Sequence, residues 1–171
     1  TGKRSLYPDQ LKILVGAASC GLAAGAREVE AAAREAVQDL GLAATVSRTG
    51  CIGFCQQEPL VDLLLPGGPR VAFARMTPKK TRALLASHAA GKLDPAHSLC
   101  RFSQELHVPT GERHRYPEPT DGVRRVPDCS TLGFYRRQER VILRNCGTID
   151  PLSLPEAIAR GAYRGPLRAL S

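Results

Sequence analysis

Two apolar runs joined by Pro66-Gly67-Gly68-Pro69 constrain the fold of this chain more than any other sequence feature. Residues 60–65 read Leu-Val-Asp-Leu-Leu-Leu, and residues 70–75 read Arg-Val-Ala-Phe-Ala-Arg. Both runs have the length and the apolar content of strands. Glycine supplies the positive φ that a tight turn needs, and proline fixes the direction of approach. The segment therefore predicts a β-hairpin, and with it a sheet that contains antiparallel strands.

The residues around the hairpin predict a compact α/β domain. A short apolar run ending in glycine, residues 11–16, is typical of a buried strand. Apolar residues repeat at helical spacing over residues 27–40, and residues 43–47 are a candidate strand. A second helix is expected from a threonine cap and a proline at its first position, over residues 77–90. The order is β-α-β-β-β-α, and we assign it to a first domain over residues 1–91.

The character of the chain changes after residue 91. Proline, glycine, histidine and arginine are frequent over residues 92–138, and the apolar periodicity is lost. We interpret this stretch as an extended connector, because loops of such length are uncommon inside one compact domain. A short strand over residues 140–143 and a helix near residues 154–160 then predict the start of a second domain over residues 139–171.

Charge and composition narrow the function classes. The net charge is +8, which suits acidic partners or phosphate-bearing cofactors as well as nucleic acid. Eight arginines lie between Arg113 and Arg144 and could steer either kind of ligand. Four tyrosines, four phenylalanines and no tryptophan supply a stacking platform for nucleic acid poorly. No apolar run approaches the ~20 residues that span a bilayer, so no transmembrane segment is expected.

The cysteines are predicted to be reduced. The basic N-terminus, Thr-Gly-Lys-Arg, is not followed by an apolar stretch, so we expect no signal peptide and a cytoplasmic location. Cytoplasmic thiols are free or bind metals. The chain has six cysteines, at positions 20, 51, 55, 100, 129 and 146.

Three of these cysteines form a candidate metal site. Cys51 and Cys55 enclose a glycine-containing loop of the form C-x3-C, and two such thiolates can bind one iron of an iron–sulfur cluster. The second iron needs two thiolates from another loop, and Cys20 follows the first predicted strand. The predicted element order places both loops at the same end of the sheet. The alternative is that all three are small apolar residues that fill the core.

The first domain resembles the thioredoxin-like 2Fe-2S ferredoxins. The resemblance rests on residues 19–26, 50–55, 58–61, 66–69 and 77–78, and it covers roughly residues 11–91. Such domains form a small subunit of respiratory complex I, of NAD-linked hydrogenases and of formate dehydrogenases. The resemblance implies a thioredoxin-like fold and electron transfer through a 2Fe-2S cluster.

A second resemblance involves Val141-Ile-Leu-Arg-Asn-Cys-Gly-Thr-Ile-Asp-Pro151, followed by Ile158-Ala-Arg-Gly-Ala-Tyr163. This stretch looks like the start of the flavoprotein subunit that binds FMN and NADH in the same enzymes. The resemblance implies a parent polypeptide that continues past Ser171 into a glycine-rich FMN loop. FMN, NAD and a 4Fe-4S cluster would bind there, and the partners would be other subunits of the complex, including a small ferredoxin-type subunit.

The sequence departs from the ferredoxin pattern at one position. The family's first cluster loop carries a C-x4-C pair, whereas here only Cys20 is present and its partner position falls on Val15 or Gly25. Neither residue can bind iron. Nothing in the sequence places Cys100, Cys129 or Cys146 beside the other three thiols. We therefore expect an incomplete, degenerate 2Fe-2S site made of Cys20, Cys51 and Cys55.

The sequence as a whole predicts an accessory domain of an NADH-dependent oxidoreductase subunit, with docking and electron transfer as its roles and no hydride chemistry in these residues. The location would be cytoplasmic, with attachment to a membrane complex open. A free-standing 2Fe-2S ferredoxin is the first alternative. A thiol oxidoreductase needs C-x-x-C, and Cys51 and Cys55 are one residue too far apart for that motif. A nucleic-acid-binding module is the last alternative.

Overall fold

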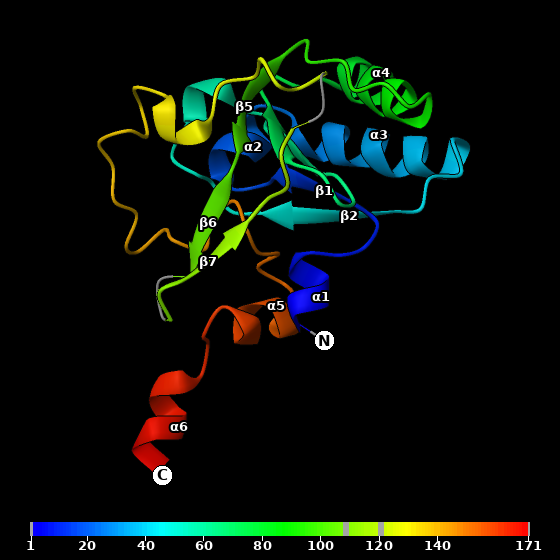
Figure 1. The fold of residues 1–171 in the computed structure, drawn as a ribbon. Helices are drawn as coiled ribbons and strands as arrows, with labels where there is room; N and C mark the ends of the chain where they lie inside the picture. Colours follow the sequence, from blue (N-terminus) through cyan, green and yellow to red (C-terminus); the bar gives the residue numbers. More distant parts are fainter. Residues whose placement is uncertain (1, 108–109, 120–121, 171) are drawn as a thin grey trace.

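The computed structural model describes residues 2–107, 110–119 and 122–170 and shows a mixed α/β fold (Figure 1). Five strands form one sheet in the order β2-β1-β3-β4-β5. Their bounds are β1 Leu11–Gly16, β2 Ala44–Thr49, β3 Val61–Leu64, β4 Arg70–Phe73 and β5 Ser98–Phe102. β1 and β2 run parallel, while β1–β3, β3–β4 and β4–β5 are antiparallel. The predicted hairpin is confirmed as β3 and β4, paired from Val61 with Phe73 to Leu64 with Arg70.

Two helices cover one face of this sheet. They are α3, Ala26–Asp39, and α4, Pro78–Ala89, and they contact each other along their lengths (Figure 1). Alternate residues of each strand point to this face. Ile13, Val61 and Phe73 are fully buried there against apolar residues of both helices. The predicted β-α-β-β-β-α order over residues 11–89 is thus confirmed.

The opposite face of the sheet is buried but polar. Lys12, Asp62 and Arg70 alternate with the apolar positions and are at most 5% exposed. Residues from the second half of the chain cover them. Lys12 pairs with Glu156, and Arg70 pairs with Asp62 and Glu105. The strands are therefore buried on both faces of the sheet: one face is apolar, and the other carries paired charged side chains.

The second half of the chain adds further elements around the sheet. β5 lies inside the predicted connector and pairs with β4, and a hairpin of β6, Gln104–His107, and β7, Glu112–Arg115, follows it. The short helices are α1 Gly2–Leu6, α2 Ser19–Ala23, α5 Leu154–Ala159 and α6 Arg164–Leu170, with 3-10 turns η1 Cys55–Gln57 and η2 Cys129–Thr131. α1 contacts α5, while α6 projects away from the rest of the chain (Figure 1).

One predicted element is wrong. Residues 140–143 form turns, not a strand. Val141, Ile142 and Leu143 are 56%, 87% and 47% exposed, so the apolar run that suggested a strand has no sheet to join in the described residues. The predicted helix near residues 154–160 is confirmed as α5, which begins at the capping hydroxyl of Ser153. None of the described helices has the length and apolar character required to cross a bilayer.

Candidate metal centre

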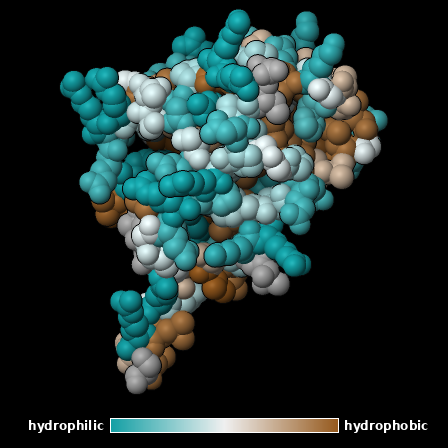
Figure 2. Space-filling view, viewed as in Figure 1, coloured by the Kyte–Doolittle hydropathy of each residue, from teal (hydrophilic) through white to brown (hydrophobic). Residues whose placement is uncertain are grey.

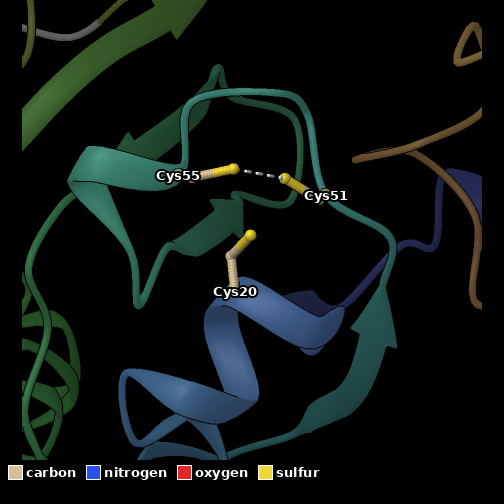
Figure 3. A group of neighbouring side chains, drawn as sticks. All are labelled: Cys20, Cys51 and Cys55. Atoms are coloured by element: carbon tan, nitrogen blue, oxygen red, sulfur yellow. Dashed lines mark hydrogen bonds between the residues drawn. The ribbon is translucent and has the colours of Figure 1, made fainter.

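The three predicted thiols lie together at one end of the sheet (Figure 3). Cys20 is in the first turn of α2, directly after β1. Cys51 and Cys55 belong to the loop that follows β2. Because β1 and β2 are parallel neighbours, the segments that follow them leave the sheet at the same edge. The side chains of Cys20, Cys51 and Cys55 point toward one another across this edge.

The sulfur positions suit a shared metal. The three Sγ atoms lie within 4.8 Å of one another, and Cys51 Sγ is 3.6 Å from Cys55 Sγ. Two thiolates on one tetrahedral ion with bonds of about 2.3 Å are about 3.8 Å apart. Cys51 and Cys55 therefore have the separation of a pair on one ion, as their spacing predicted. Cys20 and Cys55 are exposed and Cys51 is half-buried, so the site opens to the surface.

The loop that carries the pair is shaped by Gly53 and anchored by Phe54. Gly53 has φ of 90°, a left-handed conformation that favours glycine, and its amide donates to Cys51 Sγ at 3.2 Å. Phe54 stacks on Phe134 with ring centroids 4.3 Å apart. The predicted connector thus supports the cysteine loop directly, and this contact lies far beyond the local sequence.

The pKa values of Cys20 and Cys51 are raised, which favours the protonated form of these two thiols. Burial raises the pKa of Cys51 to about 11, with the neighbouring Cys55 and Glu58 raising it further against the hydrogen bond from Gly53. A hydrogen bond with Cys55 is the main cause that raises the pKa of Cys20. A metal would therefore displace protons from these thiols on binding. The raised pKa values disfavour the thiolates of Cys20 and Cys51, and a thiolate is the nucleophile of thiol–disulfide exchange.

Glu58 is a buried acid beside the thiols, and the sequence analysis used it only as part of the ferredoxin resemblance. Its Oε2 accepts the amide hydrogen of Leu60 at 2.7 Å, and its Oε1 is buried with no hydrogen-bond partner among the described residues. The carboxyl group lies against the backbone of Gly16 and Gly21, where a Cβ atom would come within about 3 Å of it. Burial raises its pKa. The sequence contained no signal that the Glu58 carboxyl group would lie beside the thiols, because its approach to Gly16 depends on the pairing of β1 with β3.

The remaining cysteines do not complete a set of four ligands. Val15 is buried in β1 and Gly25 precedes α3, so neither candidate partner position offers a ligand atom. Cys100 is buried in β5, where a hydrogen bond with Cys129 and burial raise its pKa. A 2Fe-2S cluster needs two terminal ligands on each iron, and the grouped thiols provide three. Cys51 and Cys55 can supply both protein ligands of one iron, and Cys20 can supply one of the two protein ligands of the other iron.

Cys146 lies nearer than the sequence suggested. Its Sγ would be 3.1 Å from a Cβ atom built on Gly50, the residue before Cys51. It nevertheless stays outside the group of three sulfurs that lie within 4.8 Å of one another. The sequence contained no signal for this approach, because 95 residues separate Cys51 from Cys146.

No protein-family model matches the chain, and no curated protein matches it. Solved structures are similar in part. The wild-type thioredoxin-like [2Fe-2S] ferredoxin from Aquifex aeolicus is 20% identical, with a TM-score of 0.46, and the similarity covers 53% of this chain and 96% of that one. A second structure of a thioredoxin-like [2Fe-2S] ferredoxin from Aquifex aeolicus is 20% identical with a TM-score of 0.47, covering 54% of this chain and 92% of that one. The mixed α/β fold of this chain follows from its own strand order, β2-β1-β3-β4-β5, and from its strand register.

Proposed function

We propose that this chain is an electron-transfer and docking domain of an NADH-dependent oxidoreductase subunit, with an incomplete 2Fe-2S site. The observation that carries the proposal is the group of Cys20, Cys51 and Cys55 at the exposed edge of the sheet. An electron carrier needs its redox centre near the surface, and Cys20 and Cys55 are exposed while Cys51 is half-buried. The arrangement keeps the outline of a cluster site.

The C-terminal segment supports the docking part of the proposal. Ile142, Leu152 and Leu170 are 87%, 83% and 88% exposed, and the apolar atoms of α6 are visible on its projection (Figure 2). Large apolar side chains with this degree of exposure, repeated along one part of the chain, are consistent with an interaction surface. Ile142 and Leu152 lie within residues 141–163, whose sequence resembles the start of an FMN- and NADH-binding flavoprotein, and α6 follows directly after them. We propose that this surface contacts a flavoprotein body and the other subunits of such a complex.

Incomplete ligation leads to a specific expectation for the metal. An iron held by one protein thiolate is open to water and oxygen, and its potential is poorly controlled. We therefore expect the aerobically purified chain to be colourless and to contain no stoichiometric iron or sulfide. It should keep its fold, because the apolar core under α3 and α4 contains none of the three thiols.

Metal analysis after anaerobic purification tests this proposal. The wild type is compared with Cys20→Ala and Cys146→Ala, with Cys129→Ala as a control outside the site. If the wild type contains about two irons per chain and both Cys20→Ala and Cys146→Ala lose them, the cluster is complete and Cys146 is one of its ligands. That result would contradict the incomplete site and favour a free-standing ferredoxin.

The subunit assignment has a separate test. The coding sequence beyond Ser171 should continue into a glycine-rich loop at the start of a helix, where backbone amides and the helix dipole favour the FMN phosphate. A stop codon directly after Ser171 would refute the fused-subunit part. The residues described here contain no G-x-G-x-x-G, so they should neither bind FMN nor oxidise NADH.

A further inference from the structure

A cavity on the polar side of the sheet is lined by four arginines. It has a volume of about 120 Å³ and lies between β4, the β5–β6 turn and the segment around Cys146. The guanidinium groups come from Arg70, Arg140, Arg144 and Arg160. They belong to three separate parts of the chain, because Arg140 and Arg144 share one segment, and the tertiary structure brings these parts together.

The carboxylates nearby balance only part of this charge. Arg70 is paired with Asp62 and Glu105, and Arg160 lies 3.8 Å from the same Glu105. Four positive groups thus face two negative ones, and two positive charges are in excess. Arg140 and Arg144 use one nitrogen each on backbone carbonyl groups and form no salt bridge among the described residues.

Buried donors in the cavity lack partners. The Nε atoms of Arg144 and Arg160 and the hydroxyl of Tyr135 are buried and have no hydrogen-bond partner among the described residues. The side chain of Arg160 is only 4% exposed. Buried donors without partners cost free energy, and folded proteins usually satisfy them. Three such donors around one cavity that carries excess positive charge indicate a missing acceptor.

We propose that this cavity binds a phosphate group, either inorganic phosphate or the phosphate of a nucleotide. A phosphate group near neutral pH carries about 1.5 to 2 negative charges, which is closer to the excess in the cavity than the single charge of a carboxylate. Guanidinium groups bind phosphate through paired hydrogen bonds. A volume of about 120 Å³ equals the share of about four water molecules in the liquid, which accommodates a tetrahedral oxyanion. The proposal is independent of the thiol site.

Calorimetric titration of the full chain tests the assignment at low ionic strength. Inorganic phosphate, AMP and acetate are compared at matched salt concentration. We expect saturable phosphate binding that exceeds acetate binding at least tenfold. The binding should weaken as the dianion is protonated, at about pH 7 for inorganic phosphate and at about pH 6 for AMP. Tighter binding of AMP than of phosphate identifies a nucleotide as the source, and tighter binding of phosphate identifies the free anion. Equal affinity for acetate and phosphate would overturn the phosphate assignment.

Two variants connect binding to the cavity. Tyr135→Phe removes only the unpartnered hydroxyl, and Arg144→Gln removes one partly exposed charge, so both should fold. Each should raise the dissociation constant for phosphate about tenfold or more, while Arg137→Gln, an exposed arginine outside the cavity, should change it less than twofold. Phosphate should also raise the melting temperature of the wild type more than that of Tyr135→Phe. Absence of saturable binding, or equal weakening by Arg137→Gln, would refute the site.

Discussion

Replacing Glu156 by leucine should destabilise the protein strongly, because it leaves a buried charge without a partner. Lys12 and Glu156 are 1% and 2% exposed, and their charged atoms are 2.7 Å apart. Glu156 also accepts hydrogen bonds from Ser5 Oγ and from the amide of Asp150, each at 2.7 Å. In the variant, the Lys12 ammonium keeps only the carbonyl of Ser5 at 2.8 Å.

The expected cost follows from this geometry. Removing one partner of a buried ion pair costs about 3–5 kcal/mol of unfolding free energy. For a chain of this size, that loss lowers the melting temperature by about 6–20 °C. The double variant Lys12→Met/Glu156→Leu should recover most of the loss, because no charge is then left buried. Denaturant unfolding followed by circular dichroism measures the unfolding free energy of the wild type, of Glu156→Leu and of the double variant.

An exposed pair provides the matched control. Arg82 and Glu35 are 2.6 Å apart, but their side chains are 51% and 58% exposed. Glu35→Leu should therefore change the unfolding free energy by no more than about 1 kcal/mol. A cost for Glu156→Leu as small as that of the control would refute the reasoning. So would a double variant that is no more stable than Glu156→Leu alone.

Two further predictions concern the edge of the sheet near the thiols. Gly21→Ala should lower the unfolding free energy by about 1–3 kcal/mol, because its Cβ atom would lie 2.1 Å from the carbonyl oxygen of Gly16. Gly165→Ala, which meets open space in α6, should change it by less than about 1 kcal/mol in the same urea titration; equal effects would contradict the packing argument. Glu58→Gln should make the protein more stable than the wild type at pH 7 and leave it nearly unchanged at pH 4. The raised pKa of Glu58 means that the folded state binds its proton more tightly, so wild-type stability falls as pH rises from the ordinary value of 4.5 through the raised one. Urea unfolding at both pH values checks this, and a Glu58→Gln variant that is less stable than the wild type at pH 7 would show that the charged carboxylate is stabilising.

Local sequence signals determined the β3–β4 hairpin and the point where α4 begins. Pro66-Gly67-Gly68-Pro69 predicted the β3–β4 hairpin, and the threonine cap before Pro78 predicted the start of α4. These signals act within a few residues, through φ preferences and backbone hydrogen bonds, and a sequence displays them directly. The Cys51–Cys55 spacing belongs to the same class, because a loop of five residues sets the distance between its own ends.

The approach of Cys20 to that loop depended on one more step. The element order predicted that the two cysteine loops would lie at the same end of the sheet. The structure shows why they do: β1 and β2 are parallel neighbours, so the segments that follow them leave the sheet at the same end. Topology of this kind can be inferred when the order of strands and helices is simple. The sequence could not show the position of Cys146, because its approach to Gly50 depends on how the C-terminal segment returns across the sheet.

The tertiary structure alone decided the chemistry of the second sheet face. Lys12, Asp62 and Arg70 lie in strands whose residues are all buried. The alternation of side chains along a strand predicts that these three residues share a face of the sheet, but it does not identify what covers that face. Lys12 and Arg70 also have partners in the second half of the chain, Glu156 of α5 and Glu105 of β6. A buried charge is stable only when a distant group of opposite charge reaches it, and long-range pairing of this kind leaves no local pattern in a sequence.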